Sequence, residues 1–225
     1  MNVLKAHKKK LTPPESAEDT RQRLLEAAGE VFAEKGFRSA TVREICSRAG
    51  ANVAAVNYHF GDKDRLYAAV LKYAHRRALE KFPPSLGLPE SASAEDRLKV
   101  FIRSFLYRVL DEGRPSWHGK LMTRELADPT AALDSLVEES IRPTYETLTG
   151  IIGEMLGKAA SSDLRYFANS IVGQCVFYCH AAPVLERLAP GKFKSSEIER
   201  LAEHISQFSL CALRQPRKTG GRRNK

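Results

Sequence analysis

The fold is decided by residues 41–60, which read TVREICSRAGANVAAVNYHF. Thr41 and Glu44 form a Thr-x-x-Glu pair, which is typical of a capping box and predicts a short helix over about 41–48. Gly50 follows this helix and supplies a tight turn, because glycine adopts the left-handed conformation that often ends a helix. The stretch therefore begins with one very short helix and a sharp change of direction.

A second short helix is predicted directly after the turn. Asn52 can cap it, and the helix then runs over about 52–58 with Val53 and Val56 facing inward. Short helices are marginal alone and need packing on their neighbours. Two of them joined by a glycine turn predict a helix-turn-helix, in which the first helix crosses the DNA backbone and the second enters the major groove.

The outward residues of the second helix suit contact with bases. Ala54, Ala55 and Asn57 are small or hydrogen-bonding, so the helix could approach base edges closely. Basic and polar side chains around this face suit phosphate oxygens. Taken singly, Arg43 and Lys63 would be ordinary solvated charges. The complete predicted DNA-binding set is Thr41, Arg43, Asn52, Ala54, Ala55, Asn57, Tyr58, His59 and Lys63.

The whole chain is predicted to be all-α, because apolar residues recur at helical spacing almost throughout. Before the helix-turn-helix, Ser16 and Asp19 form a capping box that opens a helix ended by Gly36. After it, Asp62 caps a fourth helix. The further helices are expected at about 62–81, 94–111, 116–126, 130–157, 162–187 and 196–213.

Four regions are predicted along the chain. Residues 1–15 form a disordered basic arm, 16–62 the helix-turn-helix domain with the start of the fourth helix, 63–213 a ligand-binding and dimerisation domain, and 214–225 a disordered basic tail. The Pro-, Gly- and Ser-rich loop 83–94 is the best candidate for a domain boundary.

Net charge is +9 over 225 residues, and the surplus lies at the two ends. Residues 212–225 carry six basic and no acidic side chains, which favours a polyanionic partner, although a solvated tail has the same composition. The chain lacks both a run of about 18 apolar residues and a signal-peptide pattern, so a cytoplasmic protein with no membrane partner is expected.

Catalysis and metal binding are not expected. The sequence holds no Gly-rich phosphate loop, GxSxG elbow or HExxH motif, and its six histidines are scattered. Cys175, Cys179 and His180 share a helix face, but their neighbours are apolar, which favours buried free cysteines over a metal site. No cofactor is predicted.

The helix-turn-helix resembles the signature of the TetR family of repressors. The resemblance rests on GFRSATVREI at 36–45, the Ala-Gly turn at 49–50 and VNYHFGDKDRL at 56–66. The turn is followed by Ala51-Asn52, where the family often has Val-Ser or Val-Thr. This departure leaves the cap intact but can alter base preference. Residues 122–134, MTRELADPTAALD, look like the CecR-type subgroup, whose members respond to small toxic compounds.

The resemblance implies a homodimer sealed by the last two long helices, a palindromic double-stranded operator and a small-molecule effector that releases the repressor. The effector cavity would lie among the helices of residues 94–180, with the helix 62–81 as the lever between the domains. An activator, a ligand-independent regulator or a sequence-independent architectural protein remain alternatives. The candidate effector-binding residues are Phe101, Phe105, Arg108, Trp117, Met122, Arg124, Tyr145, Phe177 and Tyr178.

Overall fold

The computed structural model describes residues 16–110, 117–157, 161–188 and 195–215, which contain helices and no β-strand. These residues form two compact units that divide between Val70 and Leu71. The division falls inside a helix and not in the loop 83–94, where the composition changes. Both predicted basic ends lie outside the described residues, except Arg214 and Gln215.

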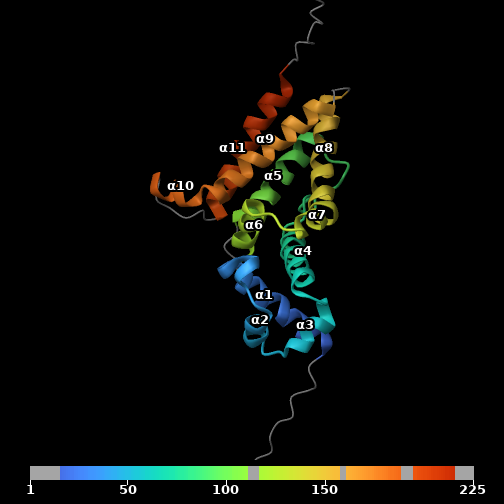
Figure 1. Cartoon of the computed structure of the whole chain (residues 1–225). Coiled ribbons are helices and arrows are strands. Elements are labelled where there is room, and N and C mark those ends of the chain that lie inside the picture. The colour runs from blue at the N-terminus through green and yellow to red at the C-terminus, as the bar shows by residue number, and fades with distance from the viewer. Residues whose placement is uncertain (1–15, 111–116, 158–160, 189–194, 216–225) are drawn as a thin grey trace, which may run out of the picture. The chain divides into compact units, whose positions relative to one another are not determined.

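The first unit is built from α1 (Ala17–Ser39), α2 (Val42–Ala49), α3 (Val53–Phe60) and the start of α4 (Lys63–Lys81) (Figure 1). The predicted capping box at the start of α1 is confirmed: Asp19 N–H donates to Ser16 Oγ over 3.1 Å, and Ser16 N–H donates to Asp19 Oδ2 over 3.1 Å. Gly36 has φ 78° and interrupts α1 near its end. Completely buried side chains fill the centre: Leu24, Val31, Phe32, Ile45, Val56 and Leu66.

The start of α4 belongs to the first unit because its inner side chains complete that core. Tyr67 is buried and lies edge-on to Phe32, with 4.8 Å between the ring centres. Its ring centre also lies 4.9 Å from that of Phe37. Asp62 caps the helix as predicted, since its Oδ1 accepts from Arg65 N–H over 2.8 Å. These contacts explain why the boundary lies at Val70, past the predicted start of the second domain.

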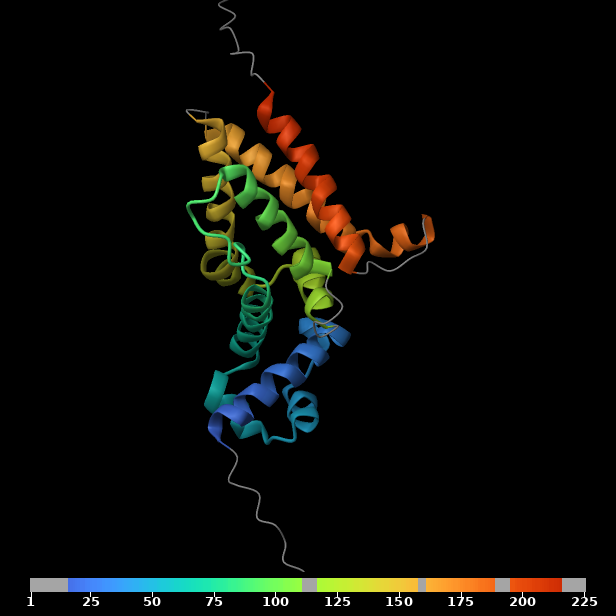
Figure 2. The ribbon, with the colours of Figure 1, turned by 180° about the vertical axis from the view of Figure 1, so that it is seen from behind.

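In its described residues, the second unit holds the rest of α4 and eight further helical segments. They are α5 (Ala94–Leu110), α6 (Trp117–Ala127), α7 (Ala132–Leu136), the π-helical segment η1 (Val137–Ile141), α8 (Arg142–Leu156), α9 (Ser161–His180), α10 (Ala182–Leu188) and α11 (Ser195–Arg214). The central helix is α5, which contacts α8, α9 and α11 (Figure 2). The core between them includes Leu98, Ile102, Leu148, Ile171, Ile205 and Leu210.

Two long helices predicted in this unit are interrupted, each near a proline. The helix predicted over 130–157 contains the wider turns of η1 just before Pro143, whose ring would clash with the carbonyl four residues earlier in a regular helix. The helix predicted over 162–187 breaks at Ala181, and Pro183 then lies in the first turn of α10, where proline is tolerated. At the other end of the unit, α11 includes Arg214, whose Nε donates to Glu95 over 3.0 Å, so Arg214 belongs to the folded unit and not to the predicted tail.

Candidate functional site

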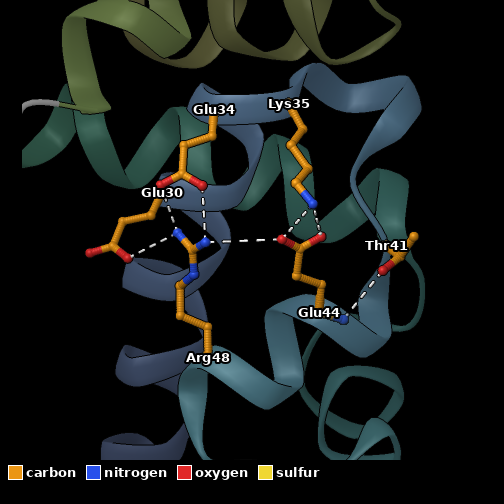
Figure 3. Close-up of polar contacts among 6 residues, drawn as sticks. All are labelled: Glu30, Glu34, Lys35, Thr41, Glu44 and Arg48. Atoms are coloured by element: carbon orange, nitrogen blue, oxygen red, sulfur yellow. Dashed lines mark hydrogen bonds and ion pairs between the residues drawn. The ribbon is translucent and has the colours of Figure 1, made fainter.

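The helix-turn-helix is held by caps and by a cluster of charges between α1 and α2. Thr41 Oγ1 accepts from Glu44 N–H over 3.3 Å, so half of the predicted capping box forms. The Glu44 carboxylate instead pairs with Lys35 Nζ over 2.8 Å and lies 3.9 Å from Arg48 (Figure 3). Arg48 also forms two hydrogen bonds of 2.9 Å with the two carboxylate oxygens of Glu34. These contacts fix the orientation of α2 on α1.

The turn between α2 and α3 follows the sequence prediction. Gly50 is left-handed, with φ 63° and ψ 34°, and its N–H donates back to the end of α2. Asn52 Oδ1 accepts from Ala55 N–H over 3.2 Å and caps α3. Because Asn52 is a cap, its side-chain oxygen is occupied within the fold, although the residue itself is exposed.

The exposed face of α3 carries the side chains predicted to meet bases. Ala54 and Asn57 are exposed, Ala55 is partly exposed, and Tyr58 is 80% exposed. The prediction that Val53 faces inward is wrong: its side chain is 47% exposed. Val53 lies four residues before Asn57 and therefore on the same face of the helix. The sequence does not distinguish an apolar side chain on an exposed helix face from one in the core, so Val53 matches the core pattern although it is exposed.

Two basic residues given the same predicted role differ in their surroundings. Arg43 is exposed near the start of α2. Lys63 donates from Nζ to the carbonyl oxygens of Ala40 over 2.9 Å and Arg38 over 3.4 Å, and it lies 4.6 Å from the centre of the Phe37 ring. Lys63 therefore connects α4 to the end of α1, and this structural role is independent of any contact with DNA. His59 is partly exposed and packs edge-on against Tyr58, with 4.9 Å between ring centres.

A cavity of about 280 Å³ lies within the second unit. It is enclosed by the second half of α4, by α5, α6 and α8, and by α9, with Ile141 of η1. Most lining residues are apolar or aromatic. The polar exceptions include Arg108, His75, His118 and Thr144.

The cationic end of this cavity is buried. Arg108 is only 6% exposed, and its guanidinium carbon lies 5.0 Å from the ring centre of Phe105 and 5.9 Å from that of Phe101. Burial lowers the pKa of Arg108 to about 10, which leaves the side chain charged at neutral pH. Burial also lowers the pKa of His75, and the nearby charge of Arg108 adds to this effect.

Two buried cysteines are parts of the cores. Cys46 lies in the first unit and Cys175 in the second. Burial raises the pKa of Cys175 to about 12, which keeps the thiol protonated at neutral pH and unsuited to act as a nucleophile. In the part of the chain that the structure describes, no three or more His, Cys, Asp or Glu side chains group as a metal site would require.

Comparison with known proteins accounts for both units. Residues 24–70 match the model of bacterial regulatory proteins of the TetR family. Residues 94–213 match the model of the C-terminal domain of the HTH-type transcriptional dual regulator CecR. The chain belongs to the TetR family and is of the CecR type. It is therefore a DNA-binding transcriptional regulator.

Individual proteins similar to this TetR-family regulator are also transcriptional regulators. The HTH-type transcriptional dual regulator CecR of Shigella flexneri is 29% identical over 170 residues, which cover 72% of this chain and 76% of that protein. A protein of Pseudomonas aeruginosa PAO1 crystallised as a transcriptional regulator is 21% identical, with a TM-score of 0.68 over 91% of this chain and 97% of that one. A TetR-like regulator of Rhodococcus sp. RHA1 is 21% identical, with a TM-score of 0.59 over 85% and 96% of the two chains. At this identity the two solved structures establish the fold.

The cavity of the TetR-family regulator contains five of the nine residues predicted to bind an effector: Phe101, Phe105, Arg108, Met122 and Tyr145. Trp117 is buried beside His118, with 4.1 Å between ring centres, and Arg124 is exposed; neither lines the cavity. Phe177 and Tyr178 line a separate groove beside α11.

Three histidines that line the cavity are not among the residues predicted to bind an effector: His75, His118 and His180. His75 follows Leu71 and Ala74 at helical spacing, and a histidine on such an apolar face was a usable signal. His118 stands next to the only tryptophan of the chain. No helix in the described ranges is long and apolar enough to cross a membrane.

Proposed function

We propose that this regulator is a repressor that binds a palindromic operator as a homodimer and is released by a small molecule in the α4–α9 cavity. The observation that carries the proposal is the exposed face of α3, with Val53, Ala54, Asn57 and Tyr58. These side chains are small, apolar or hydrogen-bonding, as major-groove readout requires. Thr41 and Arg43 at the start of α2 would hold phosphates and fix the register, and Lys63 and His59 would add to these contacts.

Exposed aromatic side chains on α9 and α11 support the homodimer. Phe177 on α9 is 53% exposed and Phe208 on α11 is 61% exposed, and Tyr166 on α9 is also exposed. A groove between the same two helices is lined by Gly173, Phe177, His204 and Ile205, with Gln174 and Tyr178. Large exposed apolar side chains next to a groove are typical of protein interfaces. A second copy of the chain would cover them and place two α3 helices for two half-sites.

Release by the effector would act through α4. This helix has 19 residues, or about 28 Å at 1.5 Å per residue, and Ala74, His75 and Ala78 in its second half line the cavity. Its first half belongs to the unit that carries α3. A ligand that prefers one position of α4 would shift the population of operator-binding conformations by its difference in affinity for the two states.

The test is selection of bound sequences from a random DNA pool by the purified protein at physiological salt. A palindromic motif with half-sites about one helical turn apart supports a dimeric, sequence-reading regulator. A folded dimer that selects no motif would instead favour an architectural protein, whose affinity depends on salt and not on sequence. A reporter gene behind the selected motif then separates repression from activation.

A further inference from the structure

The basic side chains that line the cavity are one arginine and three histidines, and Arg108 carries a positive charge at neutral pH. Arg108, His75, His118 and His180 line it, whereas none of the described lining residues is Asp or Glu. The remainder is apolar or weakly polar and includes Phe101, Phe105, Met122, Leu148, Val172 and Val176. The cavity therefore combines an apolar body with a region of positive charge.

Arg108 is fixed in place by its surroundings. Its Nε lies 3.4 Å from the carbonyl oxygen of Ser104, one turn earlier in α5. Ser104 Oγ in turn donates to the carbonyl oxygen of Phe82 over 2.9 Å, which anchors this turn. The flat guanidinium rests against the rings of Phe101 and Phe105, the two residues that also bound the cavity. A guanidinium held in this way presents a rigid fork of N–H donors, which matches a carboxylate.

His75 adds a second feature on the cavity wall. Its Nε2 is buried and has no hydrogen-bond partner among the described residues. The ring lies close enough to Arg108 for the two groups to influence each other electrostatically. A buried polar atom without a partner is costly. Because the other ring nitrogen donates to the backbone of Ser140 and burial favours the neutral ring, Nε2 is an acceptor, and a ligand N–H or O–H that donated to it would remove this cost.

We propose that the effector is an amphipathic organic monoanion, with one carboxylate at Arg108 and an apolar body among the aromatic and aliphatic side chains. This rests on the proposed function, since it names the chemistry of the molecule that would release the operator. A cationic compound would be repelled by the buried guanidinium, and a neutral one would form weaker hydrogen bonds with it than a carboxylate does. A polyanion would leave charges in the apolar remainder of a cavity of about 280 Å³.

The experiment compares three probes that share a body and differ in charge: 4-phenylbutanoate, 4-phenylbutanamide and 4-phenylbutylamine. Binding to the full-length protein is measured by calorimetry at pH 7.5. The carboxylate is expected to bind at least about 10-fold more tightly than the amide, because charge-assisted hydrogen bonds are the stronger kind. The amine is expected to bind most weakly. The same order is expected in a longer and a shorter homologue of the series.

The variant that tests the anchor is Arg108→Met. It should weaken binding of 4-phenylbutanoate at least about 30-fold, the loss typical when one partner of a buried charge pair is removed, and leave the amide nearly unaffected. Arg108→Lys keeps the charge and should retain part of the preference for the carboxylate. It replaces Arg108→Met as the test if the methionine variant does not fold. The matched control is Arg103→Met on the same helix, since Arg103 pairs with Glu199 over 2.9 Å and does not line the cavity.

The outcomes separate this proposal from the proposed function. The proposal of a monoanionic effector is overturned if the amine or the amide binds as tightly as the carboxylate. It is also overturned if none of the carboxylates binds. Equal loss in Arg108→Met and Arg103→Met overturns the assigned anchor. Operator binding is measured independently by mobility shift: a protein that selects a palindrome but is released only by neutral or cationic compounds keeps its proposed function and refutes this inference.

Discussion

At the scale of single residues, Lys63 and Arg43 show how one expectation divides into two roles. Both are basic residues beside the recognition helix, and both were predicted to bind phosphate. The ammonium of Lys63 contacts two backbone carbonyls and the ring of Phe37, whereas Arg43 is exposed on α2. The charge of Lys63 thus contributes to folding of the first unit, and the charge of Arg43 remains accessible to DNA.

This difference predicts that substitutions at the two positions change different properties of the protein. Arg43→Ala should lower DNA affinity and make the slope of log affinity against log salt shallower by about 1, with stability unchanged within about 0.5 kcal/mol. Lys63→Met should lower the free energy of unfolding by about 1–2 kcal/mol, because charged hydrogen bonds to two carbonyls are lost. Urea unfolding and mobility shifts at several salt concentrations measure both. A Lys63→Met protein of full stability whose salt slope is shallower would contradict the structural role and leave phosphate binding as the one role of Lys63.

At the scale of elements, the turn between α2 and α3 sets the angle at which the recognition helix leaves its neighbour. Gly50 has φ 63°, and a Cβ added there would meet nothing within 4 Å. A side chain at this position therefore has space and is opposed only by the backbone conformation. Gly150 in the middle of α8 offers the comparison, since it also has open space and its backbone conformation is helical.

The two glycines predict stability changes of opposite sign. Gly50→Ala should lower the free energy of unfolding by about 1–2 kcal/mol, because an L-residue is strained in the left-handed region. Gly50→Asn should cost less, since asparagine tolerates that region. Gly150→Ala should raise stability by roughly 0.5–1 kcal/mol, because alanine loses less backbone entropy in a helix. Chemical denaturation of the three variants measures these changes, and equal effects at the two glycines would contradict the explanation.

Local signals made the first unit predictable and much of the second unit not. Caps at Ser16, Asn52 and Asp62 and the turn at Gly50 depend on residues a few positions apart, and the structure confirms all four. The cavity depends on which faces of five helices and η1 meet, which no local pattern specifies. Hence the sequence predicts Phe177 at the cavity, although it lines a separate groove, and does not single out His75, which lines the cavity. The prediction for Val53 is wrong because the sequence alone does not distinguish an exposed valine on the recognition helix from a buried one.

At the scale of the whole molecule, the apolar face of α9 and α11 is the surface that two chains would share. Phe208 and Phe177 are exposed in the single chain, whereas the core residues Ile205 and Leu210 beside Phe208 on α11 are buried. In a two-fold interface the same patch meets its own copy, so each side chain near the axis is present twice. One substitution therefore places two changed side chains in the interface.

Phe208→Glu should convert the protein to a monomer of the 25.1 kDa chain mass without unfolding it. Two carboxylates would meet in an apolar interface, where their desolvation and mutual repulsion oppose association, while the exposed position leaves the core intact. The variant should then bind the whole palindrome no more tightly than a single half-site, because the second recognition helix is no longer held beside the first. Sedimentation equilibrium and mobility shifts on whole and half palindromes measure both effects, and Phe208→Leu, which keeps an apolar contact, is the matched control. A Phe208→Glu protein that remains a dimer and binds the whole palindrome as tightly would place the interface on another face of the molecule.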